Sequence, residues 1–311
     1  MLRRMLLAAS GSDRTRNLVT SAPFTRDVVA RYVAGESQDQ AITVTRDLLA
    51  SGLLVSLDHL GEDTGDPDQA AAVTAEYTGL LGQLGAAGLA RGGRAEVSVK
   101  PTAVGLGLPE HGAKTATENI ARICTAARDA GTTVTVDMEE YGRVDATLRI
   151  VAELRQDYPD LGCVVQSQLR RSVADCAALT APGCRVRLCK GAYDAPDSVA
   201  YPARHDVDRS FARALRVLMN GSGYPMLATH DRRLIQIAAA QAALAARPPE
   251  TFEYQMLYGV RPAEQRRLAS TGAQVRVYLP YGSDWYRYLL RRLAERPANV
   301  SFFLRSLVSA R

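Results

Sequence analysis

The stretch from residue 95 to residue 138, AEVSVKPTAVGLGLPEHGAKTATENIARICTAARDAGTTVTVDM, contains the unit that decides the fold. Its two ends, Ala95–Val99 and Thr133–Met138, are short runs rich in valine and threonine, which favour strands. Between them, apolar residues recur every three or four positions over Ala116–Ala130, as on one face of a helix. Two strands joined by such a helix pair in parallel through a right-handed crossover.

The same strand-then-helix unit repeats along the rest of the chain. The expected strands are Leu53–Leu57, Ala95–Val99, Thr133–Met138, Gly162–Gln166, Arg185–Cys189, Pro225–Thr229, Phe252–Met256 and Gln274–Leu279. The helices that follow them are expected at Gln69–Leu89, Ala116–Ala130, Ala146–Tyr158, Ser172–Leu179, Asp206–Asn220, Arg232–Leu244, Ala263–Ser270 and Asp284–Arg296. The strands are short and largely apolar, which is typical of strands covered on both faces.

This α/β pattern predicts a closed (β/α)8 barrel of the TIM type, with an open doubly wound sheet as the alternative. Residues 1–50 precede the first strand, and we expect them to form an N-terminal helical extension. Within it, Arg26–Val33 and Thr43–Leu49 are expected to be helices packed on the barrel. Residues 51–311 are then expected to form the catalytic barrel, so that the chain is a single domain overall.

Composition excludes several classes of protein. The chain has 311 residues, 47% of them hydrophobic, and its formal net charge is +5, so bulk disorder is excluded and nucleic acid is not an expected partner. The five cysteines form no C-x-x-C pair, which argues against a disulfide framework or a metal cluster. The apolar run near the start is too short for a signal peptide, and we therefore expect a cytoplasmic protein.

Polar side chains stand at the carboxyl ends of the predicted strands, where barrel enzymes carry their active sites. The residues at this rim are Asp58, Lys100, Asp137, Gln166, Arg187, Lys190, Thr229, His230 and Tyr278. The last predicted helix adds Arg291 and Arg292, and a guanidinium binds carboxylates or phosphates bidentately. The cations at this rim therefore predict an anionic ligand, such as a phosphorylated cofactor with a carboxylate substrate.

Each of these residues also has a purely structural interpretation. Lys100 could form a salt bridge with Asp137, His230 could cap a helix, and Arg291 and Arg292 could be surface residues favoured by the helix dipole. The chain has no P-loop and no complete G-x-G-x-x-G pattern, so a Rossmann nucleotide site is unsupported. The order of the polar groups on successive strands indicates a site more strongly than any one of them.

Several motifs resemble those of the proline dehydrogenase family, in particular its bacterial monofunctional members. They are RYVAGE (31–36), SLDHLGE (56–62), SVKPT (98–102), VTVDMEE (134–140), RVRLCKGAY (185–193), LATH (227–230), VYLPYG (277–282) and YLLRRLAER (288–296). The resemblance runs from about Asp27 to Leu307 in the order of the family. The R-L-x-K-G-A-Y and L-x-R-R-L motifs are its most specific parts.

The resemblance implies a distorted (β/α)8 barrel that binds FAD without a Rossmann domain. It implies oxidation of L-proline to Δ1-pyrroline-5-carboxylate, the first step of proline catabolism to glutamate, with electrons passing from the flavin to a membrane quinone. The enzyme that consumes the product, pyrroline-5-carboxylate dehydrogenase, would be a metabolic partner. A cytoplasmic protein that docks peripherally on the inner face of the membrane is compatible with these implications and with the basic surface.

The resemblance also assigns roles to residues by motif. Asp137 and Arg187 would be the catalytic pair. The substrate residues would be Lys100, Tyr193, Tyr278, Arg291 and Arg292, with Glu295 holding Arg291. The residues in contact with FAD would be Met138, Gln166, Lys190, Gly191, Ala192, Thr229 and His230, and no metal is expected.

Two other functions fit part of the pattern. A Schiff-base aldolase on the same barrel would use Lys100 as its nucleophile beside Asp137, but it leaves the arginine pair without a role. A small-anion binding protein would not need a carboxylate, a lysine and several arginines on one rim. A visible flavin spectrum would separate both from the dehydrogenase.

Overall fold

The computed structural model describes residues 29–286 together with residues 288 and 289. Eight parallel strands close into a barrel in chain order, and the last strand pairs with the first. The strands are β1 (Leu54–His59), β2 (Ala95–Val99), β3 (Val134–Val136), β4 (Gly162–Gln166), β5 (Arg185–Cys189), β6 (Tyr224–Ala228), β7 (Glu253–Leu257) and β8 (Val275–Tyr281). The predicted closed barrel is confirmed, and the open sheet is excluded.

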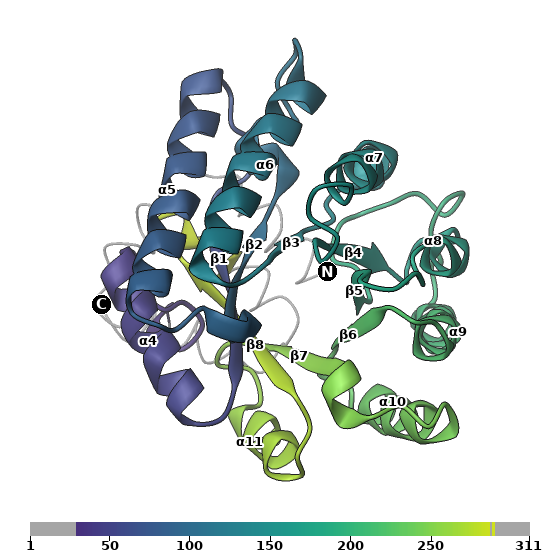
Figure 1. The fold of residues 1–311 in the computed structure, drawn as a ribbon. Coiled ribbons are helices and arrows are strands. Elements are labelled where there is room, and N and C mark those ends of the chain that lie inside the picture. The colour runs from purple at the N-terminus through teal and green to yellow at the C-terminus, as the bar shows by residue number, and fades with distance from the viewer. Residues whose placement is uncertain (1–28, 287, 290–311) are drawn as a thin grey trace, which may run out of the picture.

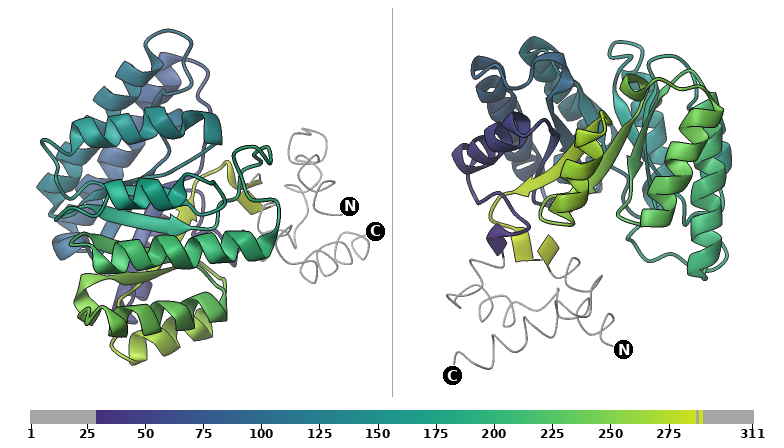
Figure 2. Two further views of the ribbon diagram at one scale, coloured as in Figure 1. Left: turned by 90° about the vertical axis from the view of Figure 1, so that its right-hand side faces the viewer. Right: turned by 90° about the horizontal axis from the view of Figure 1, so that it is seen from below.

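The helices surround the strands (Figure 1) and lie along the outside of the barrel (Figure 2). They are α4 (Gln38–Ala50), α5 (Pro67–Ala86), α6 (Gly112–Ala130), α7 (Val144–Leu154), α8 (Ser172–Ala178), α9 (Arg204–Asn220), α10 (Arg232–Leu244) and α11 (Pro262–Ser270). Short 3-10 turns are η1 (Arg91–Gly93), η2 (Pro101–Val104), η3 (Tyr141–Arg143) and η4 (Pro249–Thr251). Most of the predicted helix Asp284–Arg296 lies outside the described residues. Within the described ranges, no helix combines the length and apolarity that crossing a membrane requires.

Helix α4 closes the barrel at the seam between its first and last strands. It lies against both β1 and β8, where a regular barrel would place the helix that follows β8. The helix begins five residues before the predicted Thr43, because Ser37 and Gln40 form a capping box, with Gln40 N donating to the Ser37 hydroxyl. The division of the chain at residue 50 stays a prediction, and Arg26–Val33 lies partly outside the described residues.

The two faces of the strands differ in polarity. Side chains such as Leu57, Val97 and Val277 are fully buried in the apolar core between the strands and the helices, where each contributes roughly 1.5–3 kcal/mol. The alternate positions point into the barrel, as hydrogen bonds between β5 and both β1 and β7 show, and they are largely polar. The strands are covered on both faces, as expected, but the inner face is less apolar than expected because polar groups there satisfy one another.

Candidate active site

The predicted catalytic pair meets at the C-terminal rim. Arg187 Nη1 donates to Asp137 Oδ1 at 2.6 Å, and the arginine is only 4% exposed. Ser98 connects the two, since its hydroxyl donates to Asp137 Oδ1 at 2.9 Å and accepts from Arg187 Nη1 at 2.7 Å. Tyr278, a predicted substrate residue, donates its phenol to Asp137 Oδ2 at 2.7 Å. The structure thus brings together residues from β2, β3, β5 and β8.

The guanidinium of Arg187 is held at every nitrogen. Its Nε donates to Gln255 Oε1 at 2.5 Å, and its Nη2 donates to Ser56 Oγ at 3.2 Å. Burial alone would lower the pKa of Arg187, but the charges of Asp137 and Glu96 outweigh it and raise the pKa. Arg187 is therefore a permanently charged cation with a fixed orientation.

Lys100 pairs with a different carboxylate from the one considered in the sequence. Its Nζ lies 2.5 Å from Asp58 Oδ1, with both residues buried, whereas Asp137 already accepts from Arg187. Burial alone would lower the pKa of the Lys100 ammonium, but the charge of Asp58, followed by that of Asp137, raises it. A Schiff-base nucleophile must be an uncharged amine. The direction of this shift therefore argues against the aldolase alternative.

The predicted cofactor residues lie on neighbouring strands and their loops, from β3 to β6. Gln166 Nε2 donates to the Glu139 carbonyl at 2.6 Å, and the Thr229 hydroxyl accepts from Asp231 N at 3.2 Å. His230 Nε2 accepts from Leu257 N at 2.9 Å. Hydrogen-bonding groups on adjacent strands are what an elongated, polar cofactor such as FAD requires.

The loop after β5 combines a cation with a backbone position that only glycine can occupy. Lys190 is half-exposed, and its Nζ lies 2.6 Å from Asp208 and 3.1 Å from Asp231. Gly191 has a φ of +104°, and a Cβ there would lie 2.4–2.8 Å from the Gln168 side chain. The loop therefore presents a lysine beside bare backbone, which suits the close approach of a phosphate-bearing cofactor.

The other assigned residues of these loops are less informative. The Met138 side chain lies in a small apolar cluster with Val144, Val164, Leu169 and Ala200. Ala192 is exposed, and the Tyr193 carbonyl accepts from Gln168 Nε2 at 2.8 Å. The predicted contacts of these residues with cofactor or substrate stay predictions.

The loop after β3 contains a titratable residue of the VTVDMEE motif to which the sequence analysis assigned no role. Glu139 accepts from Thr102 N at 3.0 Å and from the Thr102 hydroxyl at 2.5 Å, and so connects this loop to η2. Burial raises the pKa of Glu139 to about 7, although the hydrogen bonds from Thr102 act in the opposite direction.

The arginine pair lies outside the described residues, as does Glu295. The segment that leads to them starts at the same rim. Trp285 and Leu289 are buried with Leu60, which follows β1, and Trp285 Nε1 donates to Glu36 Oε1 at 2.9 Å.

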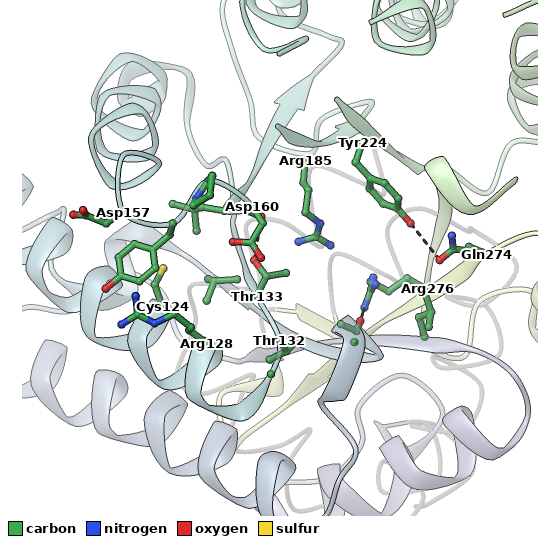
Figure 3. A pocket seen from close by; sticks show the side chains of 18 of the residues that line it. Cys124, Arg128, Thr132, Thr133, Asp157, Asp160, Arg185, Tyr224, Gln274 and Arg276 are labelled. Carbon is green, nitrogen blue, oxygen red and sulfur yellow. Dashed lines mark hydrogen bonds between the residues drawn. The ribbon is translucent and has the colours of Figure 1, made fainter. Parts of the chain in front are cut away.

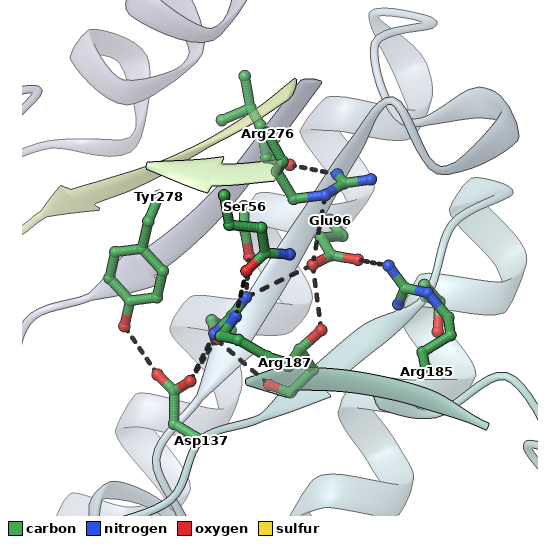
Figure 4. Close-up of polar contacts among 12 residues, drawn as sticks. Ser56, Glu96, Asp137, Arg185, Arg187, Arg276 and Tyr278 are labelled. Carbon is green, nitrogen blue, oxygen red and sulfur yellow. Dashed lines mark hydrogen bonds and ion pairs between the residues drawn. The ribbon is translucent and has the colours of Figure 1, made fainter. Parts of the chain in front are cut away.

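Some residues of the cluster were missed because their partners lie across the barrel. Glu96, Ser98 and Arg276 face inward next to Arg187, and Figure 4 shows Glu96 and Arg276 in the same network. Their sequence signal is polarity at every second position, as in E-V-S-V-K at 96–100 and R-V-R-L-C at 185–189.

A cavity of about 720 Å³ lies at the opposite, N-terminal end of the barrel (Figure 3). Its walls include residues at the starts of the strands, namely Leu54, Val134, Leu161, Arg185, Tyr224 and Arg276. Among the described residues, none of those assigned to catalysis, substrate or cofactor lines it. Because (β/α)8 enzymes act at the C-terminal face, we take the rim and not this cavity as the candidate active site.

The fold and the rim define a class: a TIM-type barrel enzyme whose buried cations and carboxylates meet at the C-terminal ends of the strands. The family model for proline dehydrogenase matches residues 41–305. Proline dehydrogenase 1 of Bacillus subtilis is 34% identical over 99% of both chains, and proline dehydrogenase of Deinococcus radiodurans is 37% identical over 91% of this chain and 90% of its own. The chain belongs to the proline dehydrogenase family.

A solved structure shows the same fold. The crystal structure of proline utilization A from Bdellovibrio bacteriovorus, inactivated by N-propargylglycine, matches with a TM-score of 0.81 and 24% identity. The match covers 87% of this chain and 33% of that chain, so this chain spans about a third of that protein.

Proposed function

We propose that the protein is an FAD-dependent L-proline dehydrogenase that forms Δ1-pyrroline-5-carboxylate and passes electrons to a membrane quinone. The observation that carries this proposal is the buried cluster at the rim, in which Arg187 is fixed by Asp137 beside the ion pair of Lys100 and Asp58. Membership of the proline dehydrogenase family supports the substrate.

FAD would be held by the residues of the loops after β3 to β6, which are Met138, Gln166, Lys190, Gly191, Ala192, Thr229 and His230. When bound, FAD supplies the capacity to accept a hydride from the ring carbon next to the proline nitrogen. Loss of hydride from the neutral amine leaves a protonated C=N bond, which gives its proton to water to form Δ1-pyrroline-5-carboxylate. An anionic group of the cofactor would find a half-exposed cation in Lys190, which it would share with Asp208 and Asp231.

The protein's own residues orient the substrate and set the electric field. Arg291 and Arg292 bind the proline carboxylate, Lys100 lies beside it, and Tyr193 and Tyr278 shape the pocket. Buried cations disfavour a charged amine, so they keep the proline nitrogen in the neutral form from which hydride can leave. With FAD bound, Arg187 would be the cation that stabilises negative charge on the reduced cofactor.

Tyr278 keeps the catalytic carboxylate oriented. Burial, followed by the charge of Asp137, raises the pKa of the Tyr278 phenol well above its usual value. The phenol therefore stays protonated and donates to Asp137 at 2.7 Å throughout the physiological range.

The cofactor provides the first test. We expect the purified protein to be yellow, to release FAD on denaturation, and to be bleached anaerobically by L-proline with formation of Δ1-pyrroline-5-carboxylate, measured by mass spectrometry. D-proline is the matched control substrate. Recovery of FMN, or of no flavin after reconstitution with FAD, contradicts the proposal.

A second test separates the aldolase alternative. Borohydride added with substrate should leave Lys100 unmodified in a peptide map, whereas a trapped adduct on Lys100 would favour the Schiff-base mechanism.

The acceptor and the location need their own test. With proline as donor, the protein should reduce a short-chain quinone. It should also bind peripherally to vesicles of anionic lipid, which represent the inner face of the membrane. The soluble product then needs a cytoplasmic enzyme that oxidises it, the role of pyrroline-5-carboxylate dehydrogenase.

A further inference from the structure

We propose that Glu96 is a positioning residue that holds Arg187 from the centre of the barrel and adjusts the charge that Arg187 would present to the flavin. Glu96 lies on β2, below the rim, and its polar contacts within the described part of the chain are with Arg185, Arg187, Arg276 and Thr135. The inference rests on the proposed function, because it concerns the field that Arg187 exerts on FAD.

Glu96 is the shared anion of three arginines (Figure 4). Its Oε2 lies 2.6 Å from Arg185 Nη2, and its Oε1 lies 3.7 Å from Arg187 Nη2 and 3.8 Å from Arg276 Nε. Thr135 donates its hydroxyl to Oε1 at 3.1 Å. Glu96 is fully buried, so little solvent screens these interactions.

The carboxylate is a permanent charge. Burial alone would raise the pKa of Glu96, but Arg185, Arg276 and Arg187 outweigh it and lower the pKa to about 2. Glu96 therefore stays ionised over the whole range in which the protein is folded and active.

Arg187 has one carboxylate on each side. Asp137 contacts Nη1 at 2.6 Å toward the rim, and Glu96 approaches Nη2 from the barrel centre. The remaining partners, Ser56, Ser98 and Gln255, are neutral, so they orient the guanidinium without changing its charge. Asp137 is the closer partner, and Glu96 is the second carboxylate that reduces the positive charge of Arg187 available to the reduced flavin.

Arg185 controls Glu96 from the other side. It is the closest cation to Glu96, and it lies in the wall of the N-terminal cavity (Figure 3), at the end of the barrel away from the rim. Removing Arg185 should leave the negative charge of Glu96 less compensated and so weaken the field of Arg187. The cavity can admit water at the truncated site, which makes this change easier to tolerate than one in the barrel centre.

The test is the midpoint potential of the flavin, measured by anaerobic redox titration against reference dyes. Glu96→Gln should raise the potential, because a more positive surrounding stabilises the anionic reduced flavin. Arg185→Met should lower it. We expect each shift to be about tenfold in the reduction equilibrium, or about 30 mV for a two-electron couple.

The matched control is Glu253→Gln. Glu253 is as fully buried as Glu96 and also pairs with Arg276, at 2.7 Å, but among the described residues its ion pair is with Arg276 and not with Arg187. The substitution Glu253→Gln should therefore raise the flavin potential less than Glu96→Gln does. Glu96→Asp keeps the charge and should restore most of the wild-type potential.

Shifts of opposite sign in the midpoint potentials of Glu96→Gln and Arg185→Met indicate an electrostatic effect. Simple loss of structure would instead weaken flavin binding in both variants. Shifts of the same sign, or a Glu96→Gln shift no larger than that of Glu253→Gln, overturn the inference. If Glu96→Gln does not fold, an unchanged flavin potential in folded Arg185→Met is enough to overturn the inference. A wild-type protein that binds no flavin overturns the proposed function itself.

Discussion

The two ends of the barrel interior contain ion pairs of nearly the same length. The upper pairs, at the C-terminal rim, are Lys100–Asp58 at 2.5 Å and Arg187–Asp137 at 2.6 Å. The lower pairs, toward the N-terminal cavity, are Arg185–Glu96 at 2.6 Å and Arg276–Glu253 at 2.7 Å. Distance and burial alone therefore do not tell a functional pair from a structural one.

One carboxylate at each end shows how their surroundings differ. Burial, with a smaller contribution from the charge of Asp137, raises the pKa of Asp58 despite the opposing charge of Lys100. The pKa of Glu96 is instead lowered by the arginines around it. Asp58 can thus take up a proton when its partner charge is removed, whereas Glu96 stays ionised. Loss of a charge at the lower end should therefore cost more stability than at the upper end, where the main effect should be on turnover. The shift in flavin potential proposed for Glu96 and Arg185 comes in addition to that cost.

Arg276→Met should have the largest effect, and it should be on stability. The change leaves Glu253 buried without its ion-pair partner and removes donors to the Val55 and Gly93 carbonyls. We expect the free energy of unfolding to fall by about 3–5 kcal/mol, measured by urea denaturation. Turnover of proline per bound flavin should fall far less than stability does. If Arg276→Met were stable but inactive, the assignment of the lower pairs mainly to stability and of the upper pairs mainly to turnover would be wrong.

Lys100→Met should show the converse behaviour. Loss of a charge-assisted hydrogen bond to substrate costs about 1.5–3 kcal/mol, so kcat/KM for proline should fall roughly ten- to hundredfold. Its effect on stability should be smaller than that of Arg276→Met, because Asp58 can bind a proton. Near-normal kcat/KM in this variant would mean that the upper pair, too, is only structural.

Glu139→Gln should have the smallest effect, and it concerns the rim. A carboxyl whose pKa is raised to about 7 in the folded state binds a proton more tightly there than in the unfolded chain. Its contribution to stability is complete below the unfolded pKa and is lost as pH rises through the folded pKa. The wild type should therefore lose about 1 kcal/mol between roughly pH 6 and 8, measured by thermal unfolding.

The amide of Glu139→Gln can still donate to the Thr102 hydroxyl and accept from its backbone N–H. The variant should therefore lack this pH dependence while remaining folded. An unchanged pH dependence in Glu139→Gln would assign the titration to another group.

Much of the fold could be predicted from the sequence because strand and helix periodicities are local. All eight strands lie within a few residues of their predicted bounds, and helix Arg232–Leu244 matches fully. The rim could be predicted as well, since parallel strands in a barrel all end on one face. This argument placed Asp137, Arg187 and Tyr278 together, and the structure connects them by hydrogen bonds.

The sequence by itself determined the repeated strand–helix unit and the set of polar groups at the strand ends. Only the tertiary structure decided the partners: Lys100 with Asp58, Glu96 among three arginines, and α4 on the seam between β1 and β8. Periodicity tells which face a side chain takes, but closure and stagger of the barrel decide which strands meet across it. Of these pairings, Glu96 and Arg276 alone are 180 positions apart, so no local pattern contains them.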